Sequence, residues 1–459
     1  MEKNSLPVYY KADVVVCGGG TAGVFAAVAA AERGKKVIMI EQFGSVGGSA
    51  TNALVTPIMG THIKGDPQCS YISTKVRDLI LAYGGADETG AKFDPLILKI
   101  VLEELCVKAG VKLLYYTFIS DVIKEDSRIK SIVIVNKSGT QLVEGDVFVD
   151  CTGDGDIGVL AGAGYTKGNP ETGKNQPISL RYIVGGIDKN AVGKFFKKEA
   201  KRTGISRAVG TDVNSKTSIY GAVTGTGEWT LSDLFEQAIA NGDLDEEDKL
   251  YWQAFSLPNR EDTLAFNNPE FFDDVDGTNP DHLTKTQIEG RRRIFRQLQF
   301  YKKYMKGFEK AYISEIAPMV GIRETRNITT EYVLSANDLI SKQKFEDAIC
   351  QSNYPVDIHG KTLDFKDYSK PVDDGKPYYE IPYRSLVVKG VDNLMVAGRC
   401  LGAEFLAQSS LRTQHSVRAS GEAAGIGAAF ALEKGVLPKD VDGKEVRTYM
   451  EKLGAEFAD

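Results

Sequence analysis

Closely spaced cysteines and histidines are missing from this sequence of 459 residues, which contains six cysteines and four histidines. The cysteines form no C-x-x-C pair and no ladder of the kind that holds an iron–sulfur cluster. Because a chain of this length builds its core without disulfides, we expect reduced thiols. The histidines show no metal-ligand spacing, so no metal site is predicted; they are His62, His282, His359 and His415.

Long apolar stretches and an excess of positive charge are also missing. No run approaches the roughly 20 apolar residues that span a bilayer, and residues 1–12 lack the apolar centre of a signal peptide. The net charge of −6 argues against broad binding to a phosphate backbone, which requires clustered lysine and arginine. We therefore expect a cytoplasmic protein that binds neither membranes nor nucleic acid, and we interpret the three arginines at 291–293 as a solvated helix face.

What is present is a globular composition, with 42% hydrophobic and 26% charged residues. At roughly 100–200 residues per domain, two or three domains are expected. The strongest local pattern comes first along the chain: a short apolar strand at 13–17, a run of glycines, an alanine-rich helix at 21–33 and a second strand at 36–40. This order of elements predicts a βαβ unit.

The glycine run at 18–23 contains the spacing G-x-G-x-x-G, and Glu41 follows the second strand. Gly18 permits a tight turn, Gly20 removes a side chain that would block a pyrophosphate, and Gly23 lets the helix lie close to the sheet. The start of the helix offers N–H groups to phosphates, and the carboxylate of Glu41 can accept hydrogen bonds from a ribose. The unit is therefore predicted to bind a dinucleotide, either NAD or FAD.

Three later segments bear on which dinucleotide is bound. A glycine-bearing loop at 42–51 directly follows the acidic residue, and a Thr-Gly-Asp turn at 152–154 follows a strand. The tripeptide Ala-Gly-Arg at 397–399 also follows a strand and precedes a helix rich in small residues. The glycines at 153–158 repeat the first spacing, but no strand that ends in an acidic residue comes after them, so no second nucleotide fold is predicted.

Together these motifs resemble the FAD-dependent oxidoreductases of the glutathione-reductase-like superfamily. Further matches resemble an FAD-dependent oxidoreductase family distantly similar to fumarate reductase flavoprotein subunits; they lie at 307–309, 317–326, 357–359 and 381–386. One departure is Asn327, where the family pattern leads us to expect another arginine. The resemblance implies FAD as the cofactor, with contacts from Gly18, Gly20, Thr21, Ala22, Gly23, Glu41, Gln42, Gly47, Gly48, Ser49, Thr51, Thr152, Gly153, Asp154, Gly398, Arg399 and Arg412.

The predicted fold class is α/β, with a Rossmann-like FAD-binding domain that contains an inserted β-meander at 119–149. We expect this domain to be discontinuous, comprising residues 1–175 and 390–459. An inserted α+β substrate or cap domain with a helical segment is expected at 176–389. Other expected elements are strands at 111–116, 178–184 and 394–397, and helices at 95–109, 284–305 and 442–453.

The chemistry is narrowed by the lack of cysteine between residues 42 and 68, which excludes the redox pair of disulfide reductases. The remaining interpretation is an enzyme that transfers a hydride between flavin N5 and a small polar organic substrate, with a possible electron-carrier partner. Arg323, Arg326 and Arg384 are candidates to hold a carboxylate. The candidate catalytic residues, chosen because their segments are expected to return to the flavin, are His62, His415, Arg384 and Tyr383.

Two alternatives remain open. A non-catalytic or redox-sensing FAD-binding subunit of a complex would hold flavin without turnover and would expose an apolar patch. An FAD-dependent protein that modifies RNA would need a basic face, which the acidic balance of the chain disfavours.

Overall fold

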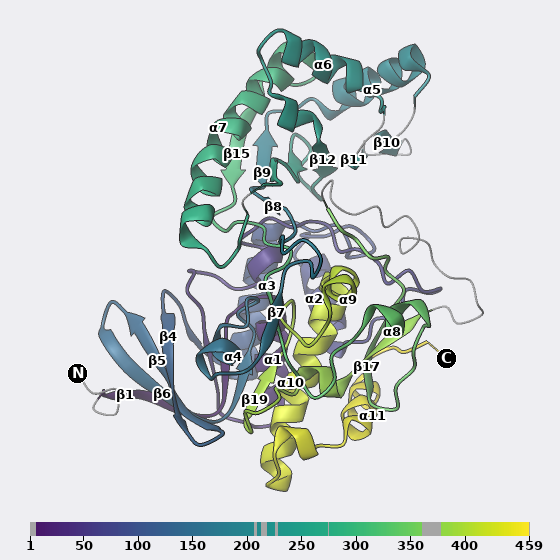
Figure 1. Cartoon of the computed structure of the whole chain (residues 1–459). Helices are drawn as coiled ribbons and strands as arrows, with labels where there is room; N and C mark the ends of the chain where they lie inside the picture. The colour runs from purple at the N-terminus through teal and green to yellow at the C-terminus, as the bar shows by residue number, and fades with distance from the viewer. Residues whose placement is uncertain are drawn as a thin grey trace.

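The computed structural model describes residues 6–205, 209–212, 218–224, 228–273, 275–359 and 378–458. Figure 1 shows two bodies: a larger one that contains the first and last elements of the chain, and a smaller one above it that carries the long helix α7.

The larger body is built on a mostly parallel sheet. Strand β1 (Val8–Cys17) pairs in parallel with β2 (Val37–Ile40) on one side and with β6 (Gly139–Asp150) on the other. Strand β3 (Lys112–Leu114) extends the sheet beyond β2, and β19 (Leu394–Val396) pairs in parallel with β6. This sheet confirms the α/β fold class, and β19 adds residues near 394 to the strands from the beginning of the chain.

The register brings the carboxyl ends of these strands together. Cys17 lies opposite Ile40 on one neighbour and opposite Asp150 on the other, and Asp150 lies opposite Val396. Because the motifs directly follow these residues, all of them meet at one edge of the sheet. Ligands of open α/β sheets bind at such an edge.

The predicted β-meander is confirmed. Strand β4 (Phe118–Glu125) pairs antiparallel with β5 (Arg128–Asn136), and β5 pairs antiparallel with β6. The meander shares β6 with the parallel strands, so it continues the same sheet.

Two small-residue helices pack on the sheet and on each other. Helix α1 (Thr21–Glu32) lies against α10 (Gln414–Lys434) at a distance that only glycine permits. A Cβ on Gly421 would lie 2.3 Å from the carbonyl oxygen of Ala22, and a Cβ on Gly425 would lie 2.2 Å from that of Ala26. The alanine-rich sequences thus form helices whose backbones touch.

The smaller body is an antiparallel sheet with the strand order β10-β11-β12-β13-β9-β15. Its centre includes β12 (Tyr251–Ser256), β13 (Leu264–Phe266) and β9 (Tyr182–Gly185), and helix α7 (Pro280–Tyr304) covers one face. Stacked aromatic side chains, such as Trp252, fill its core.

The remaining described elements have the following bounds: α2 Tyr71–Ala82, α3 Pro95–Ala109, α4 Asp156–Leu160, β7 Tyr165–Lys167, β8 Ile178–Ser179, α5 Lys189–Thr203, β10 Val209–Asp212, β11 Ser218–Thr224, α6 Ser232–Ala240, β14 Glu270–Phe271, β15 Tyr312–Ile316, β16 Arg326–Ile328, α8 Ala336–Ile340, β17 Ala348–Ser352, β18 Tyr379–Pro382, α9 Phe405–Leu411 and α11 Gly443–Leu453, with short 3-10 turns at 48–50, 246–249, 383–386 and 438–440. Within the described ranges, no helix has the length and apolar character needed to cross a bilayer.

The strand expected at 178–184 is wrong in its middle. The chain forms β8 and β9 as separate strands, and Leu180 and Arg181 lie between them. At the break the N–H of Leu180 donates to the carbonyl of Pro269, and the carbonyl of Arg181 accepts from the N–H of Ala317. The side chain of Arg181 lines a cavity. The boundaries at 175/176 and 389/390 stay predictions, but buried side chains between Leu334 and Val387 pack in the core of the larger body.

Candidate active site

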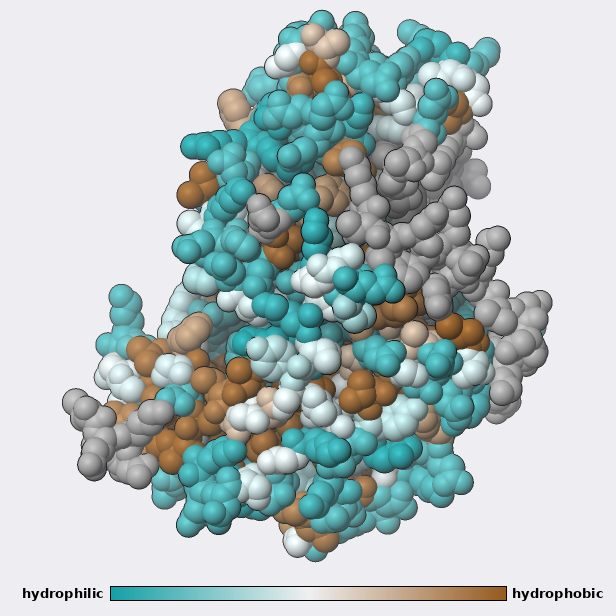
Figure 2. All heavy atoms as spheres, in the orientation of Figure 1, coloured by the Kyte–Doolittle hydropathy of each residue, from teal (hydrophilic) through white to brown (hydrophobic). Residues whose placement is uncertain are grey.

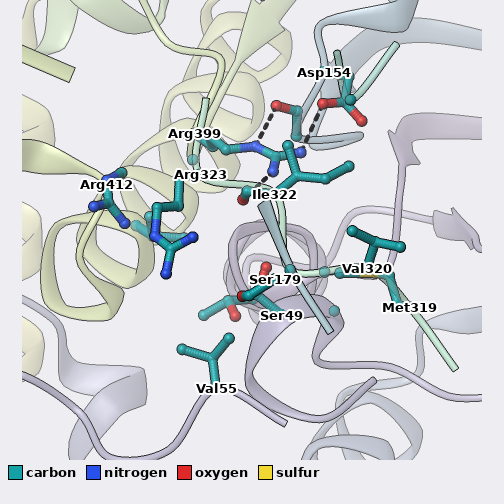
Figure 3. A pocket seen from close by; sticks show the side chains of 18 of the residues that line it. Ser49, Val55, Asp154, Ser179, Met319, Val320, Ile322, Arg323, Arg399 and Arg412 are labelled. Carbon is teal, nitrogen blue, oxygen red and sulfur yellow. Dashed lines mark hydrogen bonds and ion pairs between the residues drawn. The ribbon is translucent and has the colours of Figure 1, made fainter. Parts of the chain in front are cut away.

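A cavity of about 820 Å³ is lined by residues of both bodies. The motif glycines line it at the carboxyl ends of β1, β2 and β6. Tyr251 lines it from the antiparallel sheet, and Arg181 lines it from the residues just before β9. Helix α7 contributes residues between Leu283 and Arg291. Figure 3 shows part of the cavity wall, with the side chains of Arg323 and Arg412 pointing into the cavity.

The three motif glycines have different local roles. Gly18 has a φ of +97°, and a Cβ on it would lie 2.6 Å from the carbonyl oxygen of Cys151. A Cβ on Gly23 would lie 1.9 Å from the carbonyl oxygen of Gly18, so the helix packs directly on the turn. At Gly20 the nearest atom would be 3.8 Å away, so the space before it is open. Helix α1 begins there without a side-chain cap, which leaves first-turn N–H groups for an anion.

Glu41 presents a fixed carboxylate at this end of the cavity. Its Oε2 accepts a hydrogen bond of 2.7 Å from the N–H of Gly19, and its Oε1 accepts one of 2.8 Å from the N–H of Phe43. Burial raises the pKa of Glu41, and these backbone donors oppose that effect. Each oxygen keeps a further lone pair, so the group can still accept hydrogen bonds from ribose hydroxyls.

The loop after Glu41 is held against the glycine run at 18–23. Gly47 has a φ of +98°, and its carbonyl oxygen accepts a hydrogen bond of 3.1 Å from Thr21 Oγ1. A Cβ on Gly48 would lie 2.8 Å from the Cα of Gly20. Thr51 donates its hydroxyl to the carbonyl of Val46 at 2.6 Å. Gly48 therefore borders the cavity, while Gly23, Gly47 and Thr51 shape the backbone behind it.

The Thr-Gly-Asp turn is organised by a buried carboxylate at the end of β6. Asp150 accepts hydrogen bonds from the N–H and the hydroxyl of Thr152, at 3.1 and 2.7 Å. It also accepts the N–H groups of Ile157 and Gly158, at 2.9 and 3.0 Å. Burial raises the pKa of Asp150, and these donors counteract the rise. The turn is thus fixed to the sheet edge.

Arg399, in the Ala-Gly-Arg tripeptide at 397–399, ties this turn to the segment after β19. Its Nε donates to the carbonyl of Gly153 at 2.9 Å, and its Nη2 donates to Oδ1 of Asp154 at 2.7 Å. Its Nη1 donates to the carbonyl of Ile322, on the segment that arrives from the smaller body. The guanidinium therefore positions three segments of the cavity wall.

Charged side chains gather at the other end of the cavity. Arg323 donates to the buried carboxylate of Glu270 and, at 2.8 Å, to the carbonyl of Pro177. Arg412 donates to the carbonyl and the carboxylate of Asp357, at 3.0 and 3.2 Å. The Nε atoms of Arg181 and Arg412 are buried and have no hydrogen-bond partner among the described residues.

His359 lies between the two carboxylates of this cluster. Its Nδ1 is 3.0 Å from Glu270, and its Nε2 is 3.5 Å from Asp357. Burial and Arg323 lower the pKa of His359, but Glu270 and Asp357 raise it more, so the net direction is upward. Burial lowers the pKa of Arg181 to about 9, and Arg323 adds to this effect. Three arginines, together with a histidine whose pKa is raised, therefore face two carboxylates.

Comparison with known proteins shows which family the chain belongs to. A family model described as FAD dependent oxidoreductase matches residues 13–450. The chain belongs to this family. It is an FAD-dependent oxidoreductase, and FAD is its cofactor. No match was found among curated proteins.

Several solved flavoprotein structures resemble the chain at a distance. A flavoprotein/dehydrogenase from Cytophaga hutchinsonii is 13% identical, with 96% of this chain and 82% of that chain covered and a TM-score of 0.48. The p-nitrophenol 4-monooxygenase from Pseudomonas putida is 11% identical, with 97% and 87% covered and a TM-score of 0.48. A geranylgeranyl bacteriochlorophyll reductase-like protein from Thermoplasma acidophilum is 14% identical, with 97% and 83% covered and a TM-score of 0.44.

The cavity fits FAD. The open space before Gly20 and the uncapped start of α1 suit a pyrophosphate, and Glu41 suits the adenosine ribose. Of the residues expected to contact the cofactor, those that line the cavity are Gly18, Gly20, Thr21, Ala22, Glu41, Gln42, Gly48, Ser49, Thr152, Gly153, Asp154, Gly398, Arg399 and Arg412.

Two of the candidate catalytic residues, Tyr383 and Arg384, lie away from the cavity wall. Tyr383 is buried and donates its hydroxyl to the carbonyl of Pro438 at 3.0 Å. Arg384 pairs with Asp347 at 2.9 Å on the exposed surface. Both belong to a 3-10 turn after β18 that packs against α10, so their nearness in sequence to the Ala-Gly-Arg tripeptide does not bring them to the cavity wall.

The two histidines are not part of the cavity wall either. His415 is buried, and its Nε2 lies 3.5 Å from Cys350 Sγ and 3.1 Å from the carbonyl of Gln351. His62 contacts the ring of Tyr354 edge-on, with the ring centroids 5.2 Å apart. Tyr354 itself lines the cavity, so His62 is one residue removed from it.

Several residues at the charged end of the cavity were not predicted from the sequence. Arg181 has a signal in hindsight, since it is a charged residue inside the apolar run 178–184. Tyr251, Gln253 and Phe255 alternate along β12, and all three line the cavity, as the period of two in a strand dictates. Nothing local indicates that these residues line the same cavity as Arg412.

Proposed function

We propose that this flavoenzyme transfers a hydride between its flavin and a small polar organic substrate that carries an acidic group. Arg181, Arg323 and Arg412 would hold that group at the end of the cavity opposite Glu41. The observation that carries the proposal is the excess of buried positive charge, together with the unused Nε donors of Arg181 and Arg412.

The energetics favour an anionic ligand at this position. A buried guanidinium without a complete set of acceptors loses hydration that the protein does not replace. Arg323 has Glu270 and Arg412 has Asp357, whereas Arg181 has no carboxylate partner among the described ion pairs. A carboxylate between planar guanidinium groups supplies paired acceptors with the geometry that arginine matches.

The residues around the expected ring position support redox chemistry. When bound, FAD supplies a ring that accepts or donates a hydride. Thr413 and Gln414 line the cavity at the start of α10, which has no side-chain cap. The positive end of this helix stabilises negative charge on a nearby group. The buried wall on the side of Tyr251 and Phe255 keeps bulk water away from the substrate.

A second reactant must give or take the electrons in the other half-reaction. The described strands contain one parallel sheet with a dinucleotide fingerprint, and the second large sheet is antiparallel. This arrangement supports a separate electron carrier, either a small molecule or a partner protein.

Anaerobic spectroscopy tests the proposal directly. The purified flavoprotein is mixed with pairs of small hydroxy, amino and unsaturated compounds, each pair consisting of an acid and its uncharged amide. The oxidised flavin is followed for bleaching, and the photoreduced flavin for recovery. We expect the acid of at least one pair to react, and its amide to react at least about 100-fold more slowly, since charged hydrogen bonds contribute up to about 3 kcal/mol each.

Equal rates for an acid and its amide would contradict the role of the arginines. A flavin that exchanges electrons with an artificial carrier but with no organic compound would instead favour a redox-sensing subunit.

A further inference from the structure

A cluster of two cysteines and a histidine lies in the core of the larger body, outside the charged cavity. The ligand atoms of Cys69, Cys350 and His415 all lie within 4.8 Å of one another, and all three residues are buried. The distance from Cys350 Sγ to His415 Nε2 is 3.5 Å. None of the six cysteines is in a disulfide. The histidine that sequence reasoning assigned to catalysis is thus in a sulfur-rich pocket.

The geometry matches a tetrahedral metal site. With bonds of about 2.3 Å to sulfur and about 2.0–2.1 Å to nitrogen, two ligands of one Zn²⁺ lie about 3.5 Å apart. The distance of 3.5 Å between Cys350 Sγ and His415 Nε2 equals such an edge. The N–H of Gln351 donates to Cys69 Sγ at 3.4 Å, a contact that favours the thiolate form. The carbonyl of Gln351 lies 3.1 Å from His415 Nε2 and is within reach as a fourth ligand.

The charge balance also suits such an ion. Two thiolates and a neutral imidazole around one divalent cation give a site with no net charge, which avoids the large cost of a buried unbalanced ion. Soft sulfur ligands select zinc over magnesium or calcium. We propose that Cys69, Cys350 and His415 bind one structural Zn²⁺ ion.

Such an ion would join three segments that are distant in the sequence. Cys69 precedes the N-cap Ser70 of α2, Cys350 lies on β17, and His415 lies in the first turn of α10. Two of these segments continue directly into the cavity wall, through Tyr354 and Gln414. The ion would therefore hold the wall beside the flavin in place without contacting the substrate.

Metal analysis of the full-length flavoprotein tests the site. The protein is expressed in medium with added zinc, dialysed against a weak chelator, and assayed for zinc and FAD per chain. We expect about one zinc per chain. Cys69→Ser and Cys350→Ser should each lower the zinc content by more than about tenfold. Even substitutions of residues that only hydrogen-bond to metal ligands lower metal affinity by about 10–100-fold. Cys106→Ser, which alters another buried cysteine, should keep the zinc.

The wild-type protein provides a second measurement that requires no variant. After removal of zinc and addition of Co²⁺, we expect cobalt–thiolate absorption at wavelengths longer than those of the flavin. Wild-type protein without zinc and without this absorption would overturn the proposal, as would zinc retained equally by all three variants. A Cys69–Cys350 disulfide found by mass mapping of unreduced protein would also overturn it. None of these measurements involves the substrate, so failure here leaves the proposed function untouched.

Discussion

The two ends of the central cavity are built in different ways. At the dinucleotide end, recognition rests on backbone groups, on glycines that let them approach, and on one carboxylate, all within residues 18–48. At the charged end it rests on side chains that come from positions as distant as Arg181 and Arg412. Backbone recognition needs particular residues at fixed spacing, so it leaves a pattern in the sequence. A cluster of side chains requires only that its residues lie close together in the folded protein, so their spacing along the chain is not fixed.

The surface of the molecule shows a related contrast. Figure 2 shows apolar side chains gathered over the meander side of the larger body, while the visible face of the smaller body is mainly polar. Exposed apolar residues near β4 include Tyr116, Phe118 and Val135. The charged side chains that mark the cavity are not part of this surface, since Arg181 and Arg323 are buried.

The largest effects are expected from two glycine substitutions at the dinucleotide end. One should disturb the packing of the fold, and the other should disturb contact with the cofactor. Gly23→Ala should lower the free energy of unfolding by about 3 kcal/mol or more, because its Cβ would meet a backbone oxygen at 1.9 Å. Gly20→Ala should leave the unfolding of the FAD-free protein within about 1 kcal/mol of wild type, since its Cβ meets no atom closer than 3.8 Å. It should still weaken FAD binding by about 100-fold, or about 2.7 kcal/mol, because the methyl group occupies the phosphate space.

Thermal unfolding of FAD-free protein and a fluorescence titration with FAD measure the two effects. Normal FAD affinity in Gly20→Ala would show that the phosphates do not approach this glycine.

At the charged end, Arg181→Leu should weaken binding of the acidic substrate without weakening the fold. The loss of charged hydrogen bonds should cost about 1.5–3 kcal/mol, or roughly 10–100-fold in KM. Thermal stability should be unchanged or higher, because Arg181 has no carboxylate partner among the described residues. Steady-state kinetics and calorimetry on the same sample measure both quantities.

Arg323→Leu provides the comparison. It removes the arginine partner of the buried Glu270, which keeps only His359, and should lower stability by about 3–5 kcal/mol. If Arg181→Leu were destabilised to the same extent, Arg181 would be a structural residue and not a ligand for the substrate.

A smaller effect is expected from pH. The pKa of His359 is raised above 6.5 in the folded protein, so the imidazolium is fully present below 6.5 and is lost as the pH rises through the raised value. Affinity for the acidic substrate should fall over that window by roughly threefold to tenfold, as one positive charge disappears. His359→Gln should flatten the profile, and binding measured from pH 6 upward checks both statements. A profile unchanged in the variant would assign the pH dependence to another group.

The smallest effects are expected outside the cavity. Arg384→Gln removes a half-exposed ion pair with Asp347 and should change stability by less than about 1 kcal/mol. Its kcat and KM should match wild type, because the side chain does not reach the cavity wall. A loss of turnover by tenfold or more would restore the catalytic role that its sequence position suggested.

The sequence predictions were accurate where a feature depends on residues close together in the sequence, and inaccurate where it depends on contacts between distant segments. The helix at 95–109 was predicted with its bounds, since Asp94, Pro95 and Gly110 act within one turn of the backbone. The strand at 178–184 was not, because the backbone at Leu180 and Arg181 bonds to Pro269 and Ala317, which are distant in the sequence. His415 was assigned to the flavin from its place beside Arg412, yet its side chain points to Cys350.

The sequence by itself determined the family and the cofactor. G-x-G-x-x-G with Glu41 and the later glycine turns specify a backbone shape, and backbone shape depends on neighbouring residues. The tertiary structure decided which side chains share the far end of the cavity. Arg181, Arg323 and Arg412 come together through the packing of one body on another, and the spacing of residues along the chain carries no record of such contacts.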